Sequence, residues 1–88
     1  MFGKLYIVST PIGNLKDISS RALSVLSSVQ TIACEDTRVT RKLLSRYDIK
    51  TNLVVYNDFN CLKVLNKIIN FLKNGDNVAL VSDAGTPC

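Results

Sequence analysis

The sequence predicts an α/β fold in which four parallel strands alternate with three helices, in the order βαβαβαβ. Short apolar segments rich in β-branched residues alternate with longer segments whose apolar residues recur at helical spacing. The short segments are apolar almost throughout, which is typical of parallel strands covered on both faces. This alternation favours a parallel sheet with right-handed crossovers and helices on both faces.

The first strand and helix occupy the first third of the chain. Residues 4–9 form an apolar run, and Pro11 and Gly13 then break it. Positions 22, 23, 25, 26 and 29 are apolar at helical spacing, with serines largely on the other side. Either Asp17 or Ser19 is suited to cap this helix.

The second strand and helix follow directly. Residues 31–34 read as a short strand, and the sequence Glu-Asp-Thr-Arg at 35–38 ends it and opens a helix. On that helix Val39, Leu43 and Tyr47 recur at i, i+4 and i+8. Its cations project from the opposite side: Arg38, Arg41, Lys42 and Arg46.

The last part of the chain contains the best-defined helix. Residues 53–56 predict a third strand. Apolar side chains then cover about half of a helical wheel, at Leu62, Val64, Leu65, Ile68, Ile69, Phe71 and Leu72. Asn74 and Gly75 stop this helix, with Gly75 suited to a left-handed cap. Residues 77–81 predict the fourth strand, and the sequence Ser-Asp-Ala-Gly-Thr-Pro follows at 82–87.

Composition narrows the class of protein. Eighty-eight residues make one small domain at most, and 47% apolar content is that of a folded chain. The net charge of +4 permits a nucleic-acid partner without requiring one. No apolar run approaches the roughly 20 residues of a membrane span, and the first residues lack the features of a secretory signal. We therefore expect a cytoplasmic protein with no membrane partner.

The cysteines point away from metal and disulfide chemistry. The chain has three cysteines without CxxC spacing and no histidine. Four zinc ligands of the usual Cys/His kind are not available, so we expect no metal site. The odd count also argues against a disulfide framework. Cys34 and Cys61 lie in apolar periodic segments, where we expect them to be small core residues.

Three of the four predicted strands end in segments that suit a ligand. In an open parallel sheet, ligands bind beyond the carboxyl ends of the strands. Gly13 and Gly85 would allow backbone to approach a ligand closely, and Asp83 would accept hydrogen bonds. Neither dinucleotide nor P-loop glycine spacing is present, which disfavours a nucleotide held through its phosphates. The alternative is that these glycines and prolines only form turns.

The charged segment after the second strand has two readings of its own. Glu35 and Asp36, followed by Arg38 and Arg41, would place acids near a ligand and guanidinium groups near phosphate. The same residues would also form an internal ion-pair network, or acids favouring the helix dipole. The stripe formed with Lys42 and Arg46 is by itself more often a solvated face than an RNA site.

Three segments, in order, resemble the ribosomal RNA small subunit methyltransferase I family of the tetrapyrrole methylase superfamily. They are LYIVSTPIGNL at 5–15, EDTR with TRKLL at 35–44, and ALVSDAGTP at 79–87. The resemblance covers essentially all 88 residues but only the front of the family's chain. It implies that residues 1–88 are the N-terminal part of the cofactor-binding domain, without the rest of that domain and the C-terminal domain.

The resemblance also implies a reaction. The family transfers a methyl group from S-adenosylmethionine to the ribose 2′-hydroxyl of a cytidine in small-subunit ribosomal RNA, and is often dimeric. Its first domain has a five-stranded parallel sheet, with the cofactor in a cleft between two domains.

The resemblance assigns residues to sites. Ile12, Asp83 and Thr86 match cofactor-contacting positions. Their loop neighbours extend the expected cofactor site to Pro11, Gly13, Ala84 and Gly85. Asn14, Arg38 and Arg41 are expected on the substrate side. Separately from the resemblance, Glu35 and Asp36 are the clustered acids that could take up the proton of the ribose hydroxyl, and we expect one of them to be the catalytic base.

One departure and two alternatives accompany this reading. After the third strand the family often has histidine, whereas Asn57 and Phe59 stand here and only Tyr56 and Asn60 keep the pattern. A different superfamily methylase, acting on a tetrapyrrole or a diphthamide precursor, is one alternative, and residues 35–38 argue against it. A truncated non-catalytic remnant or binding module is the other. We expect the 88 residues alone to be inactive.

Overall fold

The computed structural model describes residues 2–9, 18–35, 37–57 and 59–82. Four strands, β1 (Leu5–Ser9), β2 (Thr31–Cys34), β3 (Asn52–Val55) and β4 (Val78–Ser82), form one parallel sheet in the order β1-β4-β2-β3. Three helices alternate with them: α1 (Ser20–Ser28), α2 (Thr37–Arg46) and α3 (Cys61–Lys73). The predicted α/β class and element order are confirmed.

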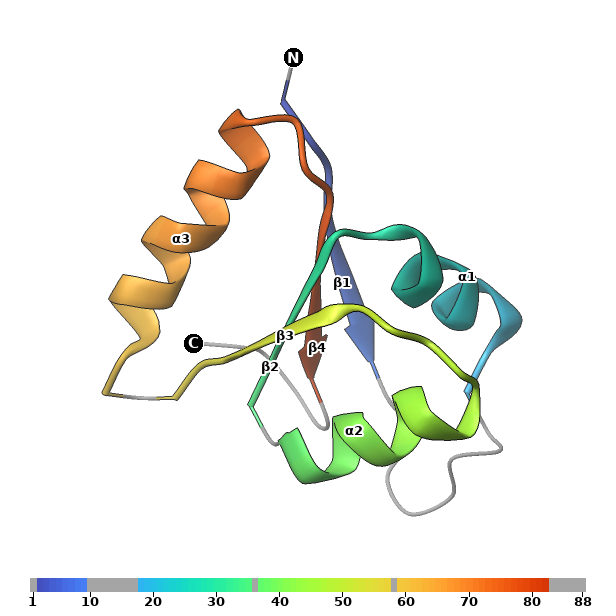
Figure 1. The fold of residues 1–88 in the computed structure, drawn as a ribbon. Coiled ribbons are helices and arrows are strands. Elements are labelled where there is room, and N and C mark those ends of the chain that lie inside the picture. Colours follow the sequence, from blue (N-terminus) through green and yellow to red (C-terminus); the bar gives the residue numbers. More distant parts are fainter. Residues whose placement is uncertain (1, 10–17, 36, 58, 83–88) are drawn as a thin grey trace.

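The helices cover both faces of the sheet (Figure 1). One apolar cluster joins α1 and α2 to the sheet, and a second joins α3 to the other face. The chain moves from β1 through β2 to β3 along one face and returns to β4 across the other. Crossovers between parallel strands are right-handed. When the chain reverses its direction across the sheet, the connecting helix must therefore pack on the opposite face.

The core lies mainly between the sheet and the α1–α2 layer. Leu26, Ile32 and Leu43 are fully buried there, and each contributes roughly 1.5–3 kcal/mol through its burial. The central strands β2 and β4 are buried along almost their whole length. Their continuous apolar sequence therefore has the predicted cause, a helix layer on each face.

β1 does not fit that expectation. Leu5 and Ile7 are 44% and 59% exposed, on the α3 side of the sheet, so the prediction of two-sided burial is wrong for this strand. Within the described residues β1 pairs only with β4 and is an edge strand. The apolar face of α3 is also covered only in part, because Val64 and Ile68 are buried while Leu62 is 77% exposed.

Local signals fixed the helix ends as the sequence indicated. Ser19, rather than Asp17, caps α1 through a hydrogen bond from the Ala22 amide to its hydroxyl at 3.0 Å. Gly75 has φ 92° and ends α3 in the left-handed region. Glu35 precedes α2, so no acid lies in that helix's first turn.

The cysteine expectations were right at one position only. Cys34 is buried in the core as predicted. Cys61 is only half-buried, at the first turn of α3, and is disulfide-bonded, so the view of it as a plain core residue is wrong.

Hydrogen bonds join the segments that enter the strands at the amino end of the sheet. The Asn77 side chain accepts from the Lys4 amide at 2.8 Å, and the Asn77 amide donates to the Gln30 side chain at 2.6 Å. Gly3 lies against the turn after α3, where its amide donates to the Leu72 carbonyl at 2.7 Å. The opposite end of the sheet is the candidate site.

Candidate functional site at the carboxyl edge of the sheet

The carboxyl edge brings together the ends of strands that are far apart in sequence. In the register of the sheet Ser9 is paired with Ser82, and Cys34 with Val81. Glu35 therefore follows β2 directly beside Ser82. Neighbouring strands lie about 4.8 Å apart, so the segments after β1, β4 and β2 begin side by side.

This convergence was expected, but most of the expected site residues lie outside the described part of the chain. These are Pro11, Ile12, Gly13, Asn14, Asp36, Asp83, Ala84, Gly85 and Thr86. Glu35, Arg38 and Arg41 are described, and all three are exposed. Glu35 lies at the strand end, and the two arginines lie on α2, which begins two residues later.

Tyr56 is a site residue whose role sequence reasoning missed. It follows β3, is 3% exposed, and donates its hydroxyl to the Val81 carbonyl at 3.0 Å. Its amide donates to the Cys34 carbonyl at 3.0 Å. Tyr56 thus ties the ends of β3, β2 and β4 together, immediately before the segment that contains Asp83. The sequence predicts Tyr56 as the last residue of the third strand, whereas β3 ends at Val55.

The turn after Tyr56 is held by two asparagines. The Asn57 side chain accepts from the amides of Phe59 and Asn60 at 2.9 and 3.0 Å. The Asn60 side chain accepts from the Asn57 amide at 2.7 Å and donates to the Val55 carbonyl at 3.3 Å. Asn57 therefore has a structural role as a turn-former. Phe59 is fully exposed on this turn.

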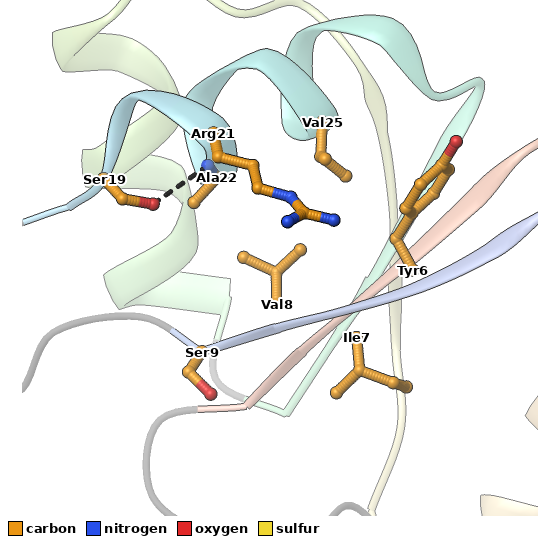
Figure 2. Close-up of a pocket in the computed structure, with 8 residues that line it drawn as sticks. All are labelled: Tyr6, Ile7, Val8, Ser9, Ser19, Arg21, Ala22 and Val25. Atoms are coloured by element: carbon orange, nitrogen blue, oxygen red, sulfur yellow. Dashed lines mark hydrogen bonds between the residues drawn. The ribbon is translucent and has the colours of Figure 1, made fainter.

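A groove of about 310 Å³ runs along the outer edge of β1, beside α1. Figure 2 shows the Arg21 guanidinium extending over it between Val8 and Val25. Ser9 and Ser19 line the groove where β1 ends. Of the expected site residues that the structure describes, none (Glu35, Arg38 or Arg41) lines this groove. The groove lies along the edge strand β1 and reaches the carboxyl edge at Ser9.

Two searches of the described residues bear on the expected partners. No group of three or more His, Cys, Asp or Glu side chains there is arranged to hold a metal ion. None of the helices in the described ranges combines the length and apolar character that crossing a membrane requires.

Comparison with known proteins identifies the family. The sequence profile of the Tetrapyrrole (Corrin/Porphyrin) Methylases matches residues 4–88. The chain belongs to the tetrapyrrole methylase family. Its parallel sheet and helices agree with a tetrapyrrole methylase domain.

Individual relatives of this tetrapyrrole methylase chain narrow the resemblance. It is 55% identical over 85 residues to Ribosomal RNA small subunit methyltransferase I of Bacillus subtilis, covering 97% of this chain and 29% of the relative. The protein of that name from Rickettsia prowazekii is 53% identical over 83 residues, 94% of this chain and 30% of the relative. The protein of that name from Mycoplasmopsis pulmonis is 52% identical over 84 residues, which cover 96% of this chain and 38% of the relative.

The resemblance found in the three sequence segments is therefore confirmed. The chain spans about a third of the length of the curated relatives that it matches. Those relatives are named as ribosomal RNA methyltransferases.

Proposed function

We propose that this chain is part of an enzyme that methylates small-subunit ribosomal RNA, with S-adenosylmethionine as donor and the 2′-hydroxyl of a cytidine as acceptor. The observation that carries the proposal is the 52–55% identity over nearly the whole chain to relatives with one name. In this proposal residues 1–88 form the first part of the cofactor-binding domain, and the whole enzyme is a cytoplasmic homodimer.

The carboxyl edge suits one wall of the cofactor site. The segments after Ser9 and Ser82 start on paired strands, so a single ligand can contact both. We assign the cofactor to the residues of these segments: Pro11, Ile12, Gly13, Asp83, Ala84, Gly85 and Thr86. The Tyr56 hydrogen bond to Val81 supports the assignment, because it fixes the strand end from which the second segment leaves.

Methyl transfer to a ribose hydroxyl requires residues of the chain to align the two reactants and to accept a proton. When bound, S-adenosylmethionine would supply an electrophilic methyl group to an oxygen that attacks in line with the sulfur–methyl bond, the neutral thioether being the leaving group, so positioning provides much of the rate. The ribose hydroxyl becomes a good nucleophile only as its proton is removed. Glu35 is exposed beside the end of β4, and we assign the base to Glu35 or Asp36.

The substrate side is assigned to Asn14, Arg38 and Arg41. Guanidinium groups pair with phosphate through two parallel hydrogen bonds, which fixes the direction of the RNA backbone as well as its distance. Both arginines are exposed on α2, the helix that starts directly after the proposed base.

A chimaera tests the proposal in a complete enzyme. Residues 4–88 replace the matching segment of the Bacillus subtilis relative, which is 55% identical there. We expect the chimaera to bind S-adenosylmethionine and to methylate small-subunit ribosomal RNA. Glu35→Gln and Asp36→Asn are then compared by single-turnover rates, and Asp83→Asn by calorimetry of cofactor binding.

The outcomes separate the alternatives. A chimaera that binds the cofactor but does not methylate the RNA would show that this chain is a non-catalytic remnant. Near-normal rates for both carboxylate variants would dismiss the assigned base. The 88-residue chain alone is expected to show no activity and no micromolar cofactor binding, because it supplies one wall of the cleft.

A further inference from the structure

The positive charge of this protein is concentrated on one helix. α2 contains four of the eleven cations of the chain and none of its seven acids. The rest of the chain has equal numbers of cations and acids. The net charge of +4 therefore corresponds to α2 alone, although the helix is only 10 residues long.

The cations of α2 lie on one exposed face. Thr40, Leu43 and Leu44 are buried against the sheet, and the remaining turns of the helix present Arg38, Arg41, Lys42 and Arg46 to solvent. At 1.5 Å per residue the stripe is about 12 Å long. It starts at the helix end nearest the candidate site, since α2 follows β2 and Glu35 (Figure 1).

Helix stability does not account for this stripe. Lys42 has a like charge four residues away on each side, at Arg38 and Arg46, and like charges at this spacing weaken a helix. Arg38 also lies in the first turn, where the helix dipole disfavours a cation. A solvated face chosen for stability would alternate the signs of its charges.

The stripe has the character of a phosphate-binding surface. Its exposed positions carry no large apolar side chain that would insert into a lipid surface. At its far end the Arg46 guanidinium carbon lies over the Tyr47 ring, 5.9 Å from its centre and within the range of a cation–π interaction. Flat guanidinium groups and aromatic rings are common partners of RNA.

We propose that the outward face of α2 binds the RNA backbone and leads it to the carboxyl edge of the sheet, with Lys42 and Arg46 as phosphate contacts beyond the two arginines already assigned. The inference deepens the proposed function and rests on it for the identity of the RNA. Arg38 takes part in another interaction, so the expected effects are worked from Arg41, Lys42 and Arg46.

Salt dependence measures this contact directly. Each phosphate neutralised on a single strand adds about 0.7 to the slope of log affinity against log salt. Three contacts predict that affinity falls roughly 20-fold between about 50 and about 200 mM salt, and removing one contact reduces the fall to roughly 7-fold. The measurement uses the 88-residue chain and a fluorescent single-stranded RNA of about 20 nucleotides.

The test variant is Lys42→Glu, and its matched control is Lys67→Glu on α3. Both reverse an exposed charge. Lys42→Glu replaces two like pairs at four-residue spacing, with Arg38 and Arg46, by opposite pairs, and Lys67→Glu replaces one, with Lys63. Lys42→Glu is expected to unfold at no lower urea concentration than the parent, so weaker RNA binding cannot be attributed to misfolding.

The expected result is weaker RNA binding and a reduced salt slope for Lys42→Glu, with Lys67→Glu close to the parent. Equal effects of the two variants, or no detectable RNA binding by the parent at about 50 mM salt, would overturn the inference. Equal affinity for anionic lipid vesicles would overturn it as well. The two proposals can fail separately. If RNA binding depends on Lys42 but the chimaera does not methylate RNA, the proposed function is refuted while the RNA-binding role of α2 is supported.

Discussion

Replacing Tyr56 by phenylalanine removes a single oxygen atom from the point where three strand ends meet. The hydroxyl donates to the Val81 carbonyl at 3.0 Å, and both residues are buried, at 3% and 2% exposure. The aromatic ring stays, so packing against the α3 side of the sheet is unchanged. The change therefore isolates one hydrogen bond that crosses from the end of β3 to the end of β4.

The expected loss of stability is about 1 kcal/mol, the net value of a buried neutral hydrogen bond. With a urea dependence of about 1 kcal/mol per molar for a protein of this size, the unfolding midpoint falls by about 1 M. The same loss lowers Tm by about 4–8 °C. Circular dichroism during urea and thermal unfolding measures both quantities.

Tyr6→Phe is the matched control. Tyr6 is half-buried on β1, and its ring lines the groove at the open edge of the sheet. Removal of its hydroxyl is expected to change stability by less than about 0.5 kcal/mol. If Tyr56→Phe is no more destabilising than Tyr6→Phe, the hydrogen bond does not hold the strand ends, and the role given to Tyr56 is wrong.

Three further changes test other parts of the fold. A Cβ on Gly3 would overlap the backbone carbonyl of Asp76, so Gly3→Ala is expected to cost about 1–3 kcal/mol, and a urea midpoint equal to that of the parent would contradict this. Ser19→Ala removes the cap on the Ala22 amide and is expected to cost about 1 kcal/mol, seen as a lower Tm. Ile7→Lys places a charge on the exposed edge strand, where lysine discourages edge pairing. Sedimentation should show less self-association for this variant. Unchanged self-association would mean that the chains do not associate through β1.

The sequence predicted the elements well because each has a local physical signal. The buried strands β2 and β4 are apolar at all but one residue each, Ser19 supplies a cap, and Gly75 supplies a left-handed residue. The order β1-β4-β2-β3 has no such signal, since periodicity shows that a strand exists and not which strand lies beside it. The exposure of Ile7 follows from that order and was missed for the same reason.

The candidate site was predicted in outline and not in detail. The convergence of strand ends followed from the parallel class alone, and the register of Ser9 with Ser82 bears it out. The hydrogen bond from Tyr56 to Val81 joins residues 25 positions apart, and no local sequence pattern predicts such a contact.

The position of β4 in the sheet has a consequence for the order in which the protein can assemble during synthesis. Among the described residues β4 comes after the other three strands in the sequence, yet it lies between β1 and β2 in the sheet. Lys4 and Asn77, which meet at its amino end, are 73 residues apart. A nascent chain can pair β2 with β3 early, but β1 has no described partner until residues 78–82 have left the ribosome. Contacts of such long sequence separation slow folding, so the sheet closes only when its central strand arrives.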